Sequence, residues 1–273
     1  MAAIDILAGL GAIFQYQFMQ HAFEAGTIVA IVAGIIGYFV VLRRSSFAAH
    51  AMAEIGFAGA AGAALLGISP VIGLLGFSTV SGAGIAVLGN RVRHRDIEIG
   101  TILAFALGLG VLFISLYSGY ATEAYSILFG EILGISSGDV LLTLALSLVI
   151  LAVTAVAYRP LLFASLDEEV AEAKGMPTLF LGIVFMLLLA AAVSIAVQVV
   201  GVLLIFALMV TPAATAIRLT KIPLHAVMIS VAIALFATWL GLFVSFYEPY
   251  PVSFFVTAIV FVLYLLTRFI RQG

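Results

Sequence analysis

Long apolar runs separated by short polar breaks are the dominant pattern of this chain. They lie at about 25 to 42, 47 to 67, 70 to 90, 97 to 117, 139 to 158, 177 to 197, 200 to 217, 223 to 246 and 251 to 269. A membrane-spanning helix needs about 20 apolar residues, and most of these runs have that length. The pattern therefore predicts an all-α, polytopic membrane helical bundle.

Two segments leave the number of transmembrane helices at eight or nine. Residues 200–217 give only about 27 Å of helix and contain Thr211-Pro212, which favours a short or re-entrant helix. Residues 119–137 are too short and too polar to cross and return, so we expect a re-entrant or interfacial helix on the outer side. No linker divides the chain, which predicts a single transmembrane domain over residues 1–273.

Composition strengthens the membrane assignment and excludes other classes of protein. Hydrophobic residues make up 65% of the chain and charged residues 9%, and the mean hydropathy is +1.32. A soluble domain of this length does not have that balance. The formal net charge of -2 provides no polyanion-binding surface, so nucleic acid is not an expected partner. The absence of cysteine excludes disulfides and thiolate metal ligands.

The positions of the basic residues predict how the chain crosses the membrane. Cytoplasmic ends of membrane helices collect Lys and Arg. With nine crossings and the N-terminus outside, all basic groups fall on the cytoplasmic side, and so does the C-terminus. The eleven basic residues are Arg43, Arg44, Arg91, Arg93, Arg95, Arg159, Lys174, Arg218, Lys221, Arg268 and Arg271.

The second apolar run carries an unusual pair of polar residues, His50 and Glu54. Positions i and i+4 project from one face of a helix about 6 Å apart, close enough for two side chains to hold one cation. A charged group inside a bilayer is costly, so a carboxylate there indicates a function. Two other interpretations remain: a local hydrogen bond that steadies helix packing, or an interfacial pair near the headgroups, about one and a half turns from Arg44.

The longest polar connection, residues 158–177, has the pattern of a short helix near its end. Asp167 is a good N-cap, Glu168 and Glu169 would occupy the first turn, and Gly175 would end the helix. The charged or helix-ending positions are Asp167, Glu168, Glu169, Glu172, Lys174 and Gly175. Such a helix is either a solvated loop element or a docking element for a cytoplasmic partner.

Four stretches give the chain a family resemblance. They are FQYQFMQHAFEAGTIVAIVAGIIGYFVVLRRSSF at 14–47, ILFGEILGISSGDV at 127–140, SLDEEVAEAKGMP at 165–177 and VGVLLIFALMVTPAATAIRLT at 200–220. On these stretches the chain resembles the permease family of bacterial ABC importers for zinc, manganese and ferrous iron. The resemblance implies that residues 165–177 are the coupling helix that docks into the ATPase. ATP hydrolysis would belong to another chain, since this one has no phosphate loop and is not expected to be an enzyme.

The resemblance also implies partners, a location and a ligand site. We expect two ATP-binding subunits, a second permease copy and an extracytoplasmic metal-binding protein, in the bacterial inner membrane. Family members carry an Asp and, four residues later, a His on the second span as suspected metal ligands. The matching positions here are His50 and Glu54, so the ligand types are kept in exchanged order.

The resulting hypothesis is a homodimeric permease that binds no cofactor and transports a divalent metal. We rank zinc first and manganese second, because imidazole and carboxylate suit both. The Gly- and Ala-rich residues 56–67 indicate close helix packing or a subunit interface, where two copies would supply two imidazoles and two carboxylates. The alternatives are an ion-coupled secondary metal carrier and an intramembrane metalloenzyme.

Overall fold

A computed structural model describes residues 13–88, 95–116, 132, 134–248 and 250–270. All regular elements in these ranges are helical, and no strand occurs within them. In chain order they are α2 (Gln17–Leu42), α3 (Ser46–Leu65), α4 (Pro70–Leu88), α5 (Arg95–Leu116), α7 (Ser137–Leu166), α8 (Glu168–Ala173), α9 (Thr178–Val200), α10 (Val202–Leu219), α11 (Pro223–Tyr247) and α12 (Val252–Ile270). Residues 119–131 and 133, within the predicted outer helix, lie outside the described residues.

The predicted all-helical membrane bundle is confirmed. Among the described residues, seven helices are long and apolar enough to cross a membrane: α2, α4, α5, α7, α9, α11 and α12. The helix α3 is not among them; its 20 residues are mostly Ala and Gly and include His50 and Glu54. The helix α10 contains only a shorter apolar stretch, Leu204–Leu219. Length and composition thus support seven spans, fewer than the eight or nine predicted.

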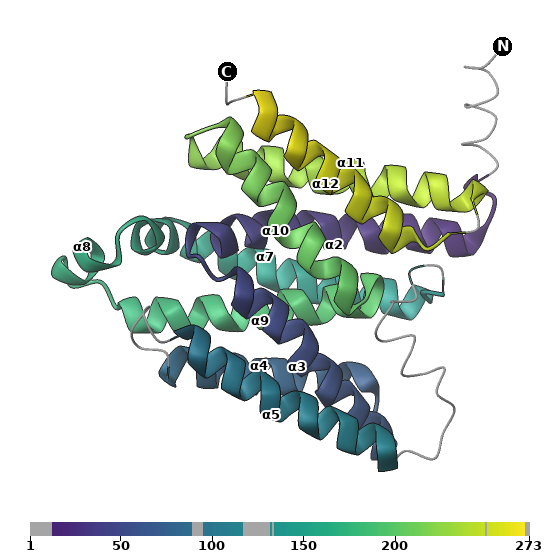
Figure 1. Cartoon of the computed structure of the whole chain (residues 1–273), viewed down its shortest axis with the longest axis horizontal. Helices are drawn as coiled ribbons and strands as arrows, with labels where there is room; N and C mark the ends of the chain where they lie inside the picture. Colours follow the sequence, from purple (N-terminus) through teal and green to yellow (C-terminus); the bar gives the residue numbers. More distant parts are fainter. Residues whose placement is uncertain (1–12, 89–94, 117–131, 133, 249, 271–273) are drawn as a thin grey trace.

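Short connections make successive helices alternate in direction, so the bundle has two distinct ends (Figure 1). The end near α8 holds the connections with Arg43, Arg44, Lys174 and Lys221. At the opposite end, α7 begins and α11 ends, with Glu248 as the C-cap of α11. Among the described residues, the basic side chains of these connections therefore gather at one end, as the sequence predicts.

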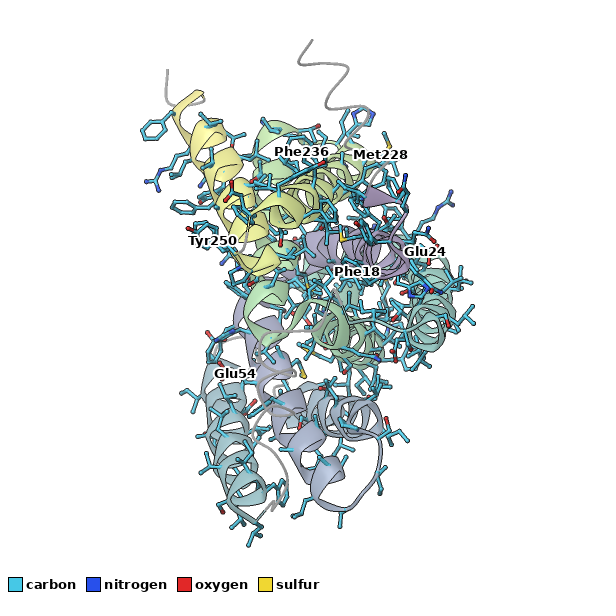
Figure 2. All side chains as sticks on the ribbon, turned by 90° about the vertical axis from the view of Figure 1, so that its right-hand side faces the viewer. Phe18, Glu24, Glu54, Met228, Phe236 and Tyr250 are labelled. Atoms are coloured by element: carbon cyan, nitrogen blue, oxygen red, sulfur yellow. The ribbon has the colours of Figure 1, made fainter. Side chains whose placement is uncertain are left out.

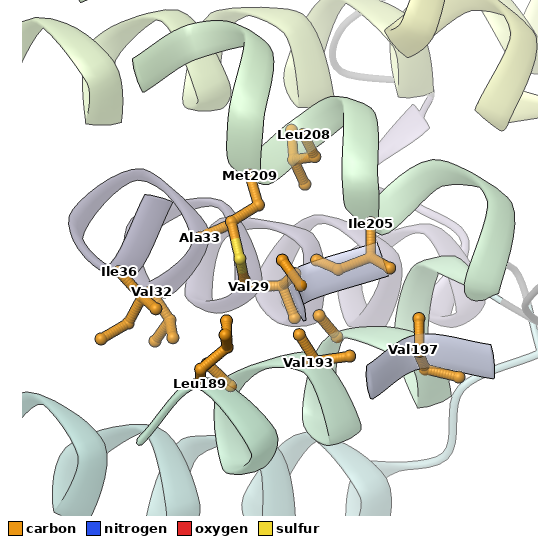
Figure 3. Close-up of a cluster of buried hydrophobic side chains, with 14 of the residues drawn as sticks. Val29, Val32, Ala33, Ile36, Leu189, Val193, Val197, Ile205, Leu208 and Met209 are labelled. Atoms are coloured by element: carbon orange, nitrogen blue, oxygen red, sulfur yellow. The ribbon is translucent and has the colours of Figure 1, made fainter. Parts of the chain in front are cut away.

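The helix α2 occupies the centre of the bundle. Two-thirds of its span, 67%, is buried, compared with 17% for α5. In Figure 3, the face of α2 that carries Val29, Val32 and Ile36 meets α9 at Leu189, Val193 and Val197 and α10 at Ile205, Leu208 and Met209. Lipid contributes no hydrophobic driving force between such helices, so close packing has to hold them together.

Glycines in α3 allow that close packing within one chain. A methyl group added at Gly59 would meet the carbonyl oxygen of Gly73 in α4, and one added at Gly62 would lie 2.9 Å from the Phe113 ring in α5. The packing interpretation of residues 56–67 is confirmed. The alternative, a subunit interface, is not available to Gly56, Gly59 and Gly62, because α4 and α5 cover them.

Candidate functional site

The helix α3 starts after a tight turn of three residues. Arg43 ends α2 and donates its backbone N–H to the Phe39 carbonyl, at 2.9 Å. Arg44 follows with φ = +54°, a left-handed conformation that is uncommon for a residue with a side chain. Ser45 then returns the chain into α3, so His50 lies in the second turn of this helix.

The side chains of His50 and Glu54 contact each other across one turn of α3. His50 Nε2 lies 3.2 Å from Glu54 Oε1, and their side chains are 43% and 28% exposed. His50 Nδ1 is buried and has no hydrogen-bond partner among the described residues. The imidazole packs edge-on against Phe206 of α10, with ring centroids 5.4 Å apart. The ring is thus held in place while the pair stays accessible from one side.

That accessible side is a narrow stripe along α3. Phe47, His50, Glu54 and Phe57 are each at least partly exposed, and they recur every three or four residues. Between them, residues 51–53 and 55–56 are buried. Figure 2 views the bundle from the end at which α7 begins, and Glu54 lies at the edge of the bundle, away from Glu24. The pair therefore faces outward from this chain.

The pair by itself offers two protein ligands. Across the described residues, no group of three or more His, Cys, Asp or Glu side chains could hold a metal ion. A zinc ion usually takes four ligands and manganese more. The pair therefore amounts to half of a tetrahedral shell, and a metal ion held there would need further ligands from elsewhere.

Other polar residues near the opposite end have structural partners. His21 Nδ1 donates to the Ile135 carbonyl at 3.1 Å; a carbonyl only accepts, so this nitrogen carries the proton. Gln198 Nε2 donates to Asp139 Oδ1 at 3.0 Å and joins α9 to the start of α7. Asp139 also completes a capping box with Ser136. These contacts hold helices together and bring no ligand to His50 and Glu54.

The short helix predicted near residues 165–177 is confirmed as α8. The Asp167 side chain accepts a hydrogen bond from the Val170 N–H at 3.0 Å, as an N-cap does. Lys174 ends the helix, and Gly175 follows at φ = +75°. Ala171 is the one buried residue of α8. Glu169, Glu172 and Lys174 are exposed, so α8 presents a charged surface at the end of the bundle (Figure 1).

Arg43 is a site residue that the sequence indicated only as a topology marker. Its Nη1 donates to Ser165 Oγ at 3.2 Å, and its guanidinium carbon lies 5.0 Å from the centroid of the Phe185 ring. Ser165 is the second-last residue of α7, next to α8, and Phe185 belongs to α9. The turn before α3 is therefore connected to the segment that carries α8. A sequence separation of 122 positions between Arg43 and Ser165 hides this contact from sequence reasoning.

Comparison with known proteins places these features in a family. Residues 15–271 match the family described as the ABC 3 transport family. The chain is 32% identical to the manganese transport system membrane protein MntC of Listeria innocua, over 87% of this chain and 85% of the relative. It is also 32% identical to the manganese import system permease protein ScaB of Streptococcus gordonii, over 85% and 83%.

A solved structure has the same fold. A chain of PsaBC from Streptococcus pneumoniae, in complex with Fab, aligns with a TM-score of 0.85 at 30% identity. The alignment covers 96% of this chain and 95% of that one. Fold and sequence similarity thus extend over nearly the whole chain.

Proposed function

Since this chain belongs to the ABC 3 transport family, we propose that it is the membrane permease subunit of an ATP-driven importer of divalent transition-metal cations. The permease domain covers residues 1–273 and lies in the bacterial plasma membrane. ATP is hydrolysed by separate subunits, and the metal is cargo rather than a resident cofactor. The observation that carries the proposal is the His50–Glu54 pair, 3.2 Å apart on the exposed stripe of a helix inside a membrane bundle.

Manganese is the first candidate for the cargo. Imidazole and carboxylate ligands suit Mn²⁺, Fe²⁺ and Zn²⁺ alike, so the pair alone does not separate them. Relatives named as manganese transporters match most of the chain, and this supports manganese ahead of zinc, the reverse of the ranking from the sequence. Zinc remains the second candidate.

The chain crosses the membrane nine times when α3 and α10 are added to the seven apolar spans. Both helices alternate in direction with their neighbours, which supports this count. The end with Arg43, Arg44, Lys174 and Lys221 is the cytoplasmic one, because basic residues collect there. The C-terminus then lies in the cytoplasm.

The exposed stripe of α3 meets a second copy of the permease. Two copies related by a two-fold axis place two imidazoles and two carboxylates around one cation. This contact uses the side of α3 that carries His50 and Glu54, rather than the glycines that α4 and α5 cover. Movement of the two copies would open the shared site to either side. An extracytoplasmic metal-binding protein delivers the cation.

The helix α8 transmits the action of two ATPase subunits. Its exposed charges provide the docking surface, and Arg43 links the adjoining end of α7 to the turn before α3. A displacement of α8 is thereby passed to the helix that holds the metal ligands. Arg43 acts as a positioning residue, since it lies outside the ligand pair.

Metal uptake by single variants tests the proposed site. We expect His50→Ala and Glu54→Ala each to abolish manganese uptake by the assembled transporter, because one ligand of each copy is lost. The double change of His50→Asp with Glu54→His restores a carboxylate and an imidazole and should keep part of the uptake. Glu248→Gln, at an exposed carboxylate away from α3, is the matched control.

Assembly with the ATPase, measured by size-exclusion chromatography, separates loss of transport from loss of folding. Wild-type uptake by Glu54→Ala would reduce the pair to a local packing contact and remove the main support for the proposed metal site.

A further inference from the structure

A hollow of about 720 Å³ lies between α2 and α11, near the end of the bundle opposite α8. We call it the aromatic groove. Phe14, Phe23, Phe236, Trp239 and Phe243 form most of its wall. Glu24 and Thr27 of α2 are the polar residues among those that line it. Its volume falls within the usual range for a small-molecule site.

The depth of the groove follows from the charges at the ends of its helices. From Glu24 to Arg43, α2 advances 19 residues, which is about 28 Å at 1.5 Å per residue. The hydrocarbon core of a bilayer is about 30 Å thick, and α2 carries no charge between these two residues. Glu24 therefore lies at the outer boundary of the hydrocarbon when Arg43 lies at the inner one. Trp239 is at the same level, as membrane-interface tryptophans are.

The groove does not face the proposed dimer contact. Figure 2 shows Glu24 and Phe236 on the side of the bundle away from Glu54. Trp239 and Phe236 are 52% and 54% exposed. In the membrane, this surface is bordered by the outer leaflet, so the molecules available to fill the groove are lipids.

Apolar filling alone would not select one lipid from another. An acyl chain gains no hydrophobic free energy by leaving the bilayer for an equally apolar groove. Selection therefore has to come from polar groups at the rim. Trp239 Nε1 already donates to Thr27 Oγ1 at 2.9 Å, which leaves the exposed Glu24 carboxylate to contact a headgroup. Among the described residues, no cationic side chain lies within ion-pair distance of Glu24.

The geometry points to a binding site for an aminophospholipid such as phosphatidylethanolamine. One acyl chain fills the aromatic groove, and the headgroup ammonium donates hydrogen bonds to the Glu24 carboxylate. An anionic headgroup without an ammonium, as in phosphatidylglycerol, is repelled by the same carboxylate. The inference needs the membrane location of α2 and α11 and does not depend on which metal is transported.

Lipid retention by the purified permease–ATPase complex tests this inference. Native mass spectrometry would compare phosphatidylethanolamine and phosphatidylglycerol with identical acyl chains. A hydrogen bond to a charged group corresponds to a preference of roughly tenfold or more for phosphatidylethanolamine. We expect Glu24→Gln to bring that preference close to one. Glu248→Gln, another exposed carboxylate at the same end, should leave it unchanged.

A second variant tests the groove itself. Ile28→Trp would fill the cavity and should lower retention of the lipid while the complex still forms, as judged by size-exclusion chromatography. Equal retention of both lipids by the unaltered protein would overturn the inference, and so would a preference that survives Glu24→Gln. A cysteine at Ile28 that cross-links to a second copy or to another subunit would show that protein, not lipid, occupies the groove.

Discussion

At the scale of single residues, side-chain contacts join the turn before the His50–Glu54 pair to a distant part of the chain. His50 Nε2 contacts Glu54 Oε1 across one turn, which lowers the cost of a carboxylate in a membrane helix. Six residues before His50, Arg44 has a strained positive φ. Arg43, next to it, reaches Ser165 and Phe185. The start of α3 is therefore held by side-chain contacts as well as by its own backbone.

Changes at Arg43 should alter the coupling of ATP hydrolysis to uptake. Arg43→Ala removes both the hydrogen bond to Ser165 and the stacking on Phe185, a loss of about 1–3 kcal/mol of contact energy, so we expect clearly fewer metal ions transported per ATP hydrolysed. Arg43→Lys keeps the charge but not the planar guanidinium, and should be intermediate. Metal binding by the assembled transporter should remain.

Ser165→Ala is the matched control, because it removes the hydrogen bond and leaves the stacking contact. Its effect should be smaller than that of Arg43→Ala. An unchanged transport-to-ATP ratio in Arg43→Ala would contradict the positioning role of Arg43. The separate proposal that His50 and Glu54 bind the metal would still stand.

At the scale of elements, α8 is a short helix whose structure depends on its two ends. Six residues are too few for a stable isolated helix, so the Asp167 cap and the turn at Gly175 define it. Lys174 adds a contact, with its Nζ 5.2 Å from the centroid of the Phe163 ring. A well-defined helix with one buried residue is what a docking element requires.

Variants of the α8 ends should uncouple the transporter. Asp167→Ala should destabilise the helix by about 1 kcal/mol, and Gly175→Val should cost about 1–2 kcal/mol through its positive φ. We also expect charge reversal at Glu168 and Glu169 to weaken contact with the ATPase. Uptake should fall in reconstituted complexes while the protein stays in the membrane. Asp96→Asn, in the first turn of α5, serves as control; normal uptake in all the α8 variants would argue against docking.

At the scale of the whole molecule, alternating helices and segregated charge define two sides. The basic connections gather near α8, and the α11–α12 connection lies at the other end (Figure 1). Two surfaces of different character also face different directions, the stripe with Glu54 and the aromatic groove with Glu24 (Figure 2). One faces a second copy in our proposal and the other faces lipid.

Cysteine labelling tests the orientation of the whole bundle. The chain has no cysteine, so single cysteines can be introduced without background. Tyr250→Cys, at an exposed position beyond α11, should react with an impermeant thiol reagent from outside the cell. Glu172→Cys in α8 should react only from the cytoplasmic side. Labelling with the two sides reversed would invert the proposed topology.

Sequence reasoning could find features that depend on neighbouring residues. The caps of α8 and the placement of His50 and Glu54 on one face of a helix are local patterns that the structure confirms, and seven of the nine apolar runs correspond to helices long and apolar enough to span a membrane. Sequence reasoning could not find the contact of Arg43 with Ser165 or the packing of α4 against Gly59, because these contacts join residues of different helices. The metal-binding role of the pair stays a prediction.

The sequence by itself determined that the chain is an all-helical membrane protein, roughly where most of its helices lie, and which end of the bundle is basic, although α2 begins at Gln17 and α7 ends at Leu166, eight residues beyond the predicted runs in each case. Hydropathy, capping and charge act over a few residues, so they can be read without a fold. Only the tertiary structure decided which side of α3 is covered and which is exposed. That outcome depends on how α4, α5 and α10 pack around it, and helix packing in lipid depends on close contact between side chains rather than on hydrophobicity.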